Sequence, residues 1–396
     1  MEEPIQINGD QENPIHFHGK SGEFFSIWIV NILLSIVTLG IYSAWAKVRT
    51  NRYFYGNTEL SGDRFDYHAK PMQILKGRIV AALVVILWVI ATEFLDPAIG
   101  GVVVLAFYLA LPWLLWANAR FDAAMTSYRN VRFSFQGRLI DAYKTLLGRG
   151  IIVFALVIGL IVWWVFALQS GSSGAAFNVT VVIGAVIIGF IGQVWIIHGA
   201  WQYFINGYQF GENKVSATLK LGKFFQIYLI SAVLGIVSLL ALAIVGGLLV
   251  FSGSIALDSL DFDSLLFSIG SVAVVFAVYF VVLSVTLVVT SYIVSQTRNY
   301  VFSQAQLENG ETPLHFRSTL SALGYAALII TNLLAQLFSI GLARPWVKVR
   351  TARYVAKHTF VLGDVENFIT QKQAQGVKSA IGDEVAQAFD VGIGIN

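Results

Sequence analysis

Long apolar runs alternate with polar segments along the chain, and six of the runs are long enough to cross a membrane. A membrane-spanning helix needs about 20 mostly apolar residues. The six runs form three pairs, and each pair is joined by a connection without lysine or arginine. These connections are Asp96–Pro97, Gln169–Phe177 and Ser252–Ser264. We therefore predict three hairpins of spanning helices: Ile79–Leu95, Ala98–Trp116, Gly150–Leu168, Ala176–His198, Phe224–Phe251 and Leu265–Val294.

Two further apolar runs, 24–45 and 322–343, flank these hairpins and are related to each other. The segments Trp45–Tyr53 and Trp346–Tyr354, where the runs end, are identical at seven of nine positions. The same offset of 301 residues aligns Asn31 with Asn332. Agreement over such a length indicates an internal repeat. Weaker sequence similarities in the region between the two copies fit five repeat units. The central three would each hold a full membrane hairpin, and the first and last would be incomplete.

Short stretches between the membrane elements alternate polar and apolar residues with a period of two. The stretches Arg64–His68 and Val131–Gly137 show this most clearly, and looser versions occur at Tyr208–Ala217, Tyr300–Phe316 and His358–Phe368. Such alternation with aromatic residues predicts half-buried strands, here one short cytoplasmic hairpin after each membrane unit. The expected fold class is an all-α polytopic membrane protein built from repeated membrane hairpins, with these β-strand segments as small additions.

The predicted organisation has three parts. Residues 1–23 form a cytoplasmic N-terminal segment, residues 24–370 an integral membrane repeat domain, and residues 371–396 a cytoplasmic tail. Apolar residues in the tail recur at a spacing of four, which predicts an amphipathic helix. They are Val377, Ile381, Val385 and Phe389.

Composition and charge support a membrane protein and predict its orientation. The chain is 56% hydrophobic and 12% charged, whereas soluble domains are about 25% charged. All 26 lysine and arginine residues lie outside the three connections named above, and short basic loops stay on the cytoplasmic side. The chain has no cysteine, which excludes disulfides, cysteine-ligated metals and cysteine nucleophiles.

The two flanking runs allow two topologies. If each crosses the bilayer once, eight spans place both termini and seven basic residues of the C-terminal region outside, against the charge rule. If each enters and leaves on the cytoplasmic side, breaking at Thr38–Gly40 and Ser339–Gly341, all 26 basic residues are cytoplasmic. We favour re-entrant elements over straight helices that merely contain a glycine. The non-helical backbone at each break would then have to be buried in protein or face water.

Three segments resemble the YjgN-like family of bacterial inner-membrane proteins: Thr38–Arg49, Thr58–Tyr67 and Gly382–Val391. The resemblance covers essentially the whole chain. It implies a multi-pass protein of the bacterial inner membrane, classified by a domain of unknown function. It brings no catalytic residues to this chain.

Polar residues at membrane depth are costly and are the first candidates for a site. Asn31 and Asn332 lie near the two proposed breaks, and Gln336 lies beside the second. These amides either contact a ligand or satisfy backbone groups that the break frees, and we favour the structural role.

The aromatic and basic residues after the two breaks form a second candidate set: Trp45, Lys47, Arg49, Trp346, Lys348 and Arg350. Tryptophan and basic side chains anchor helices at the membrane interface, and this role is favoured. The alternative is a site for an anion or an anionic lipid headgroup where the two copies meet.

Signals for catalysis are missing from the sequence. None of the six histidines belongs to an HExxH motif, and neither a GxSxG motif nor a phosphate-binding loop is present. We expect no enzyme, metal or cofactor. The favoured function is a transporter or channel-like protein for a small solute or a lipid. The alternative is a scaffold that presents aromatic cytoplasmic strands to a cytoplasmic or membrane protein. Membrane lipids are expected partners and nucleic acid is not, and the sequence carries no signal for the oligomeric state.

Overall fold

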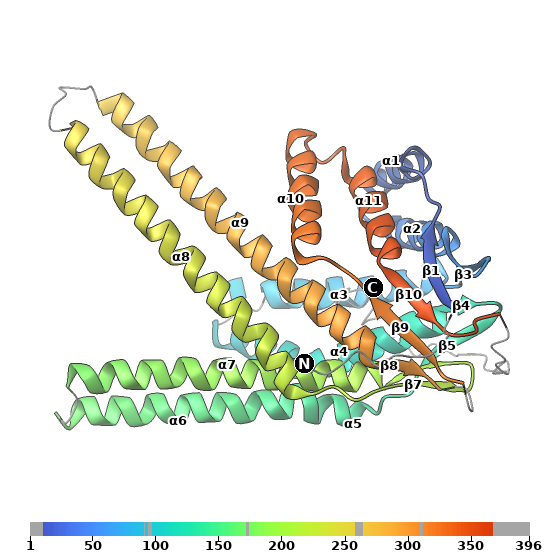
Figure 1. Cartoon of the computed structure of the whole chain (residues 1–396), viewed down its shortest axis with the longest axis horizontal. Coiled ribbons are helices and arrows are strands. Elements are labelled where there is room, and N and C mark those ends of the chain that lie inside the picture. Colours follow the sequence, from blue (N-terminus) through green and yellow to red (C-terminus); the bar gives the residue numbers. More distant parts are fainter. Residues whose placement is uncertain are drawn as a thin grey trace.

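Ten short strands form one closed antiparallel barrel, to which every helix is connected (Figure 1). The computed structural model describes residues 11–90, 92–93, 97–171, 174–257, 264–308 and 312–366, and their side chains except at 97 and 245–278. Around the barrel the strand order is β1-β10-β9-β8-β7-β6-β5-β4-β3-β2. The strands are β1 (Glu12–Phe17), β2 (Thr58–Leu60), β3 (Asp63–Tyr67), β4 (Thr126–Tyr128), β5 (Val131–Phe135), β6 (Tyr208–Phe210), β7 (Asn213–Ala217), β8 (Ala305–Leu307), β9 (Leu314–Ser318) and β10 (Thr359–Leu362).

The barrel is built from five units, each made of a strand, a helical segment that turns back and a second strand. The two strands of each unit pair with one another, as β1 with β2 and β9 with β10. Two-residue turns join the first three units, and Ser61-Gly62 and Arg129-Asn130 adopt the positive φ angles of such hairpin loops. Five units and a strand after each membrane element are therefore present in the described residues, as predicted. The cytoplasmic side of these strands stays a prediction.

The first and last strands of the chain close the barrel against each other. Glu12, Asn13 and Pro14 pair with Leu362, Val361 and Phe360. The buried Asn13 amide donates to the carbonyl oxygens of Val361, at 3.2 Å, and Gly363, at 2.8 Å. Each described strand is thus paired on both sides, which removes the exposed edges of an open sheet.

The all-α prediction is wrong, because the closed barrel is a structural core and not an addition to the helices. An isolated two-stranded hairpin is only marginally stable in water, so five neighbouring hairpins gain stability by pairing with one another. Strand β1 also lies inside residues 1–23, which the sequence analysis treated as a cytoplasmic segment separate from the membrane repeat domain.

Six helices are long and apolar enough to cross a membrane, among the residues that the structure describes. Each of the six predicted spans overlaps one of them, although Ile79–Leu95 extends past the end of its helix at Ile90. Figure 1 shows the hairpins α6–α7 and α8–α9 extending away from the strands. Their large apolar side chains are mostly exposed, as for helices that face lipid. The helices of the second to fourth units are α3 (Pro71–Ile90), α4 (Pro97–Met125), α5 (Leu139–Ala142) with a π-helical turn (Tyr143–Gly148), α6 (Arg149–Gln169), α7 (Ala175–Ile205), α8 (Leu221–Leu257) and α9 (Ser264–Gln304).

The first and last units carry shorter helices that break at the predicted residues. Helix α1 (Ser21–Val37) is followed by a turn and by α2 (Ser43–Gly56), and α10 (Ala322–Phe338) by a turn and α11 (Arg344–Lys357). Gly40 has φ +89° and Gly341 φ +84° at the two turns. Entry of these helix pairs into the bilayer from one side stays a prediction, as does the division into 1–23, 24–370 and 371–396. The predicted tail helix lies outside the described residues.

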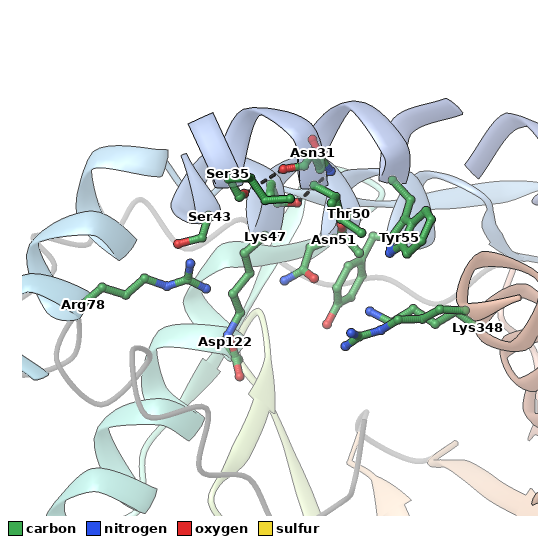
Figure 2. A pocket seen from close by; sticks show the side chains of 15 residues that line it. Asn31, Ser35, Ser43, Lys47, Thr50, Asn51, Tyr55, Arg78, Asp122 and Lys348 are labelled. Atoms are coloured by element: carbon green, nitrogen blue, oxygen red, sulfur yellow. Dashed lines mark hydrogen bonds between the residues drawn. The ribbon is translucent and has the colours of Figure 1, made fainter. Parts of the chain in front are cut away.

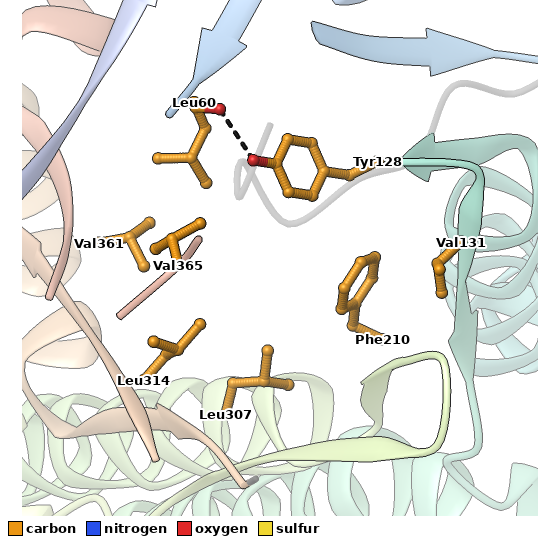
Figure 3. Close-up of a cluster of buried hydrophobic side chains, with 8 residues drawn as sticks. All are labelled: Leu60, Tyr128, Val131, Phe210, Leu307, Leu314, Val361 and Val365. Carbon is orange, nitrogen blue, oxygen red and sulfur yellow. Dashed lines mark hydrogen bonds between the residues drawn. The ribbon is translucent and has the colours of Figure 1, made fainter. Parts of the chain in front are cut away.

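The barrel lumen is apolar. Figure 3 shows eight buried side chains directed inward from strands and turns around the ring: Leu60, Tyr128, Val131, Phe210, Leu307, Leu314, Val361 and Val365. Further apolar side chains pack against them, including Phe65 and Phe133. The lumen keeps a cavity of about 500 Å³. Separate apolar clusters pack where the helices join the barrel, for example around Phe121 and around Phe224.

Candidate anion-binding pocket

A polar pocket of about 700 Å³ lies where the first and last units meet. Helices α1 and α2 of the first unit supply one side, and α11 of the last unit supplies another, packed against α1. Arg78 from α3 and Asp122 from α4 complete the lining. The barrel brings these units together, because pairing of β1 with β10 places the first unit next to the last.

Basic side chains dominate the pocket. Lys47, Arg78, Arg344 and Lys348 line it with a single carboxylate, that of Asp122. Figure 2 shows Arg78 and Lys348 entering from opposite sides, with Lys47 directed toward Asp122 between them. Four cations around one carboxylate give the pocket a positive potential, which favours an anion.

One wall of the pocket is apolar. Trp28, Ile32 and Ile36 line it from α1, beside the polar side chains of Asn31 and Ser35. Helix α1 thus presents an apolar and a polar surface to the same space. Such a lining suits an amphipathic ligand with a charged group and a hydrocarbon part.

Asn31 and Asn332 make equivalent contacts in the two copies of the repeat. The Arg49 guanidinium donates to the Asn31 side-chain oxygen at 3.3 Å, and that of Arg350 donates to Asn332 at 2.9 Å. Both asparagines are buried, at 5% and 3% exposure. The amide therefore links the two helices of each short pair across their turn. Whether it also binds a ligand stays a prediction.

The structure brings only part of the predicted site residues together. Asn31, Lys47 and Lys348 line the pocket, and the other six predicted residues do not. In the second copy the Arg350 guanidinium lies 5.0 Å from the Trp346 ring centroid, and the Gln336 amide donates to the Asn332 carbonyl at 3.4 Å. In the first copy Trp45 stacks on Tyr42. These residues support the helix pairs.

Sequence reasoning missed three charged residues of the pocket, Arg78, Asp122 and Arg344. At the offset of 301 residues Arg344 corresponds to Ser43, and both positions line the pocket. A comparison of the two repeat copies could therefore have pointed to Arg344, because this position is charged in one copy only. Arg78 and Asp122 come from other units, so only the closed barrel reveals their position.

The histidines make ordinary structural contacts. His68 hydrogen-bonds the Ser127 hydroxyl at 2.7 Å, and burial followed by the nearby Arg132 lowers the pKa of His68. His18 lies 2.9 Å from the Glu59 carboxylate. No group of three metal-ligating side chains occurs within the part of the chain that the structure describes.

The family described as "Bacterial protein of unknown function (DUF898)" matches residues 12–388. The chain belongs to this family. It is 27% identical over 380 residues to "Inner membrane protein YjgN" of Salmonella typhimurium (strain LT2), which covers 93% of each chain. It is 26% identical over 379 residues to the protein of the same name from Escherichia coli (strain K12), with 91% of this chain and 92% of the relative covered. No solved structure gave a significant match.

These matches confirm the resemblance to the YjgN-like family. With its six apolar helices, the chain is a multi-pass membrane protein whose named relatives are inner membrane proteins. The family description assigns no activity.

Proposed function

We propose that this DUF898 protein is a transporter-like membrane protein that binds a phosphate-bearing anion, the headgroup of an anionic phospholipid, in the pocket between its first and last units. The observation that carries the proposal is a lining of four basic side chains and one carboxylate around about 700 Å³. Phosphate oxygens accept strong charge-assisted hydrogen bonds from such groups.

The apolar wall supports a lipid in preference to a free phosphate ester. A small soluble anion would leave Trp28, Ile32 and Ile36 in contact with water. A phospholipid would place the upper part of its acyl chains against them, which removes apolar surface from water. The charge rule places the basic connections, and with them this pocket, at the cytoplasmic leaflet, where anionic headgroups are common.

The position between two repeats supports movement of the ligand. Transporters bind substrate at the interface of their repeats, and a displacement of one repeat against the other exposes the site in turn to each side. Helices α1 and α11 come from different units, so a shift between those units would open or close the pocket.

A scaffold role has less support. The strands of the described barrel have no free edge to which a partner could add a strand. The aromatic side chains of Phe65, Phe133 and Phe210 line the lumen cavity. A protein partner stays a prediction without a surface assigned to it.

Binding is tested with the full chain in a neutral detergent by native mass spectrometry, comparing phosphatidylglycerol with phosphatidylcholine. We expect preferential binding of phosphatidylglycerol and a loss of about fivefold in Lys348→Gln, from about 1 kcal/mol per basic residue. Lys357→Gln is the matched control, because Lys357 is an exposed lysine of the same helix outside the pocket lining. Equal binding of the two lipids, or an equal loss in Lys357→Gln, would contradict the proposal.

Competition and transport assays separate the remaining alternatives. Glycerol 3-phosphate should compete weakly, and if it binds as tightly as the lipid, the ligand is a soluble phosphate ester.

Movement of the lipid is measured in proteoliposomes containing fluorescent phosphatidylglycerol and an impermeant quencher. If the protein transports the lipid, fluorescent lipid of the inner leaflet should become accessible to the quencher, more slowly with Lys348→Gln than with the wild type. If the protected inner-leaflet fluorescence does not change, the protein binds the lipid without moving it.

A further inference from the structure

The barrel lumen is a second cavity, separate in chemistry from the basic pocket. Its volume of about 500 Å³ lies within the range of about 300–1,000 Å³ that small-molecule sites occupy. Leucine, isoleucine, valine and phenylalanine make up most of its lining, and the barrel wall is closed by paired strands. A cavity with this lining holds a hydrocarbon chain better than it holds water.

One cation in this lumen has no carboxylate partner among the described residues. The Arg298 guanidinium, on α9, donates to the Thr359 hydroxyl at 3.1 Å and lies 4.3 Å from the Phe302 ring centroid. Its Nε atom is buried without a hydrogen-bond partner. Arg129, the other arginine at the lumen, is paired with Asp63.

A guanidinium that is partly buried, with an unsatisfied Nε and no counter-charge, is costly, and a bound anion would lower that cost. The fork of an arginine matches the two oxygens of a carboxylate, which can accept from Nε and a terminal nitrogen together. A ligand with one carboxylate and one alkyl chain would therefore pair its charge with Arg298 and place its chain in the apolar cavity.

A third cavity adjoins the lumen. Its volume is about 280 Å³, and it shares Phe65, Phe133 and Phe316 with the lumen lining. It also shares Tyr55 and Asp122 with the basic pocket. These aromatic side chains therefore lie between the lumen and the third cavity.

We propose that the barrel lumen binds a long-chain fatty acid, with the carboxylate at Arg298 and the alkyl chain among the apolar side chains of the strands. This site goes beyond the phospholipid pocket and does not depend on it. The residues that carry it are Arg298, Thr359 and the inward-facing side chains around Val131 and Val361.

The probe is a palmitic acid with a photoreactive diazirine in its chain, added to the full-length protein in nanodiscs. After illumination, cross-linked peptides are identified by mass spectrometry, and unlabelled palmitate is used as the competitor. We expect cross-links in peptides that contain lumen residues such as Val131 and Val361. Cross-links confined to the lipid-facing helices would overturn the proposal.

Filling the lumen gives the matched comparison. Val361→Phe places extra volume in the cavity, whereas Leu362→Phe changes the next residue of β10, which does not line the cavity. We expect Val361→Phe to lower competed cross-linking about tenfold and Leu362→Phe to leave it unchanged. Val131→Phe also adds volume to the cavity, from β5 instead of β10. It serves as the lumen-filling variant if Val361→Phe fails to fold. An unchanged signal in a folded, lumen-filled variant would overturn the proposal.

Arg298→Gln tests the carboxylate contact. We expect it to weaken palmitate competition about tenfold or more, the usual scale for loss of a charge-assisted contact, and to leave competition by hexadecanol unchanged. Equal effects on the acid and the alcohol would refute the role of Arg298. If cross-linking appears only after residues 367–396 are removed, the chain's own tail occupies the lumen and the proposal is wrong. Unchanged phosphatidylglycerol binding in the lumen variants would show that the two sites are independent.

Discussion

The asparagine–arginine contact occurs twice in this protein, at positions separated by 301 residues. The second copy is the tighter one, because the Asn332 amide donates to the Thr351 hydroxyl at 3.0 Å, whereas the Asn31 amide donates to the Ala46 carbonyl at 3.4 Å. Repetition in the sequence pointed to these asparagines, and the structural role was favoured over ligand binding. The hydrogen bonds within each helix pair add a reason for that interpretation, which stays a prediction.

Asn332→Ala should lower stability, because it removes the bond that Asn332 accepts from Arg350 and the bond that it donates to Thr351. The expected loss is about 1–3 kcal/mol, from two hydrogen bonds of about 0.5–1.5 kcal/mol each. Gln336→Ala is the control, since its only bond to Asn332 is long, at 3.4 Å. Thermal unfolding in detergent checks the order, and an equal or larger loss in Gln336→Ala would contradict the account.

His68 should make stability depend on pH. Its folded pKa lies below 6.5, so the neutral form is favoured in the fold and the unfolded chain takes up protons first as the pH falls. Its contribution is fully present above about pH 6.5 and is lost as the pH drops toward the folded pKa. The melting temperature should therefore fall less between pH 7.5 and 5.5 in His68→Asn than in the wild type. Parallel curves for the two proteins would exclude this role.

At the scale of elements, the turns of the two short helix pairs depend on backbone conformation. Gly40 and Gly341 have positive φ angles and open space around them. An added Cβ would meet no neighbouring atom, but a residue with a Cβ is strained at this backbone conformation. We expect Gly40→Ala to destabilise by about 1–2 kcal/mol. Gly101→Ala, at an exposed position in α4, should be neutral or stabilising. Denaturant unfolding compares them, and a loss in Gly101→Ala alone would contradict this explanation.

The period-two stretches of the sequence predicted the strands, because alternation reports one buried and one exposed face. Closure could not be predicted in this way. Strand pairing depends on register between distant segments, and nothing in the pattern of Glu12–Phe17 indicates a partner near residue 360. Arg298 was likewise counted only as a basic residue at the end of a span, since its place in the lumen exists only once α9 joins the barrel.

At the scale of the whole molecule, the barrel and the basic residues should lie on the cytoplasmic side. A single cysteine at Glu212, in the turn between β6 and β7, should be unreactive toward an impermeant thiol reagent in intact cells. One at Ser170, between α6 and α7, should react. The cysteine-free chain gives a clean background, and permeabilised cells control for reactivity at Glu212. The reverse labelling pattern would contradict the orientation.

Closure of the barrel by strands β1 and β10 is the central claim, since it creates both the lumen and the pocket between the first and last units. Cysteines at Glu12 and Leu362, which are directly paired, lie within disulfide reach. Oxidation should join them within one chain, as seen by mass spectrometry of the linked peptides. The pair Glu12 and Lys214 should not react, because three strands separate β1 from β7. No disulfide between 12 and 362 in folded protein, or equal yield from both pairs, would contradict the closed barrel.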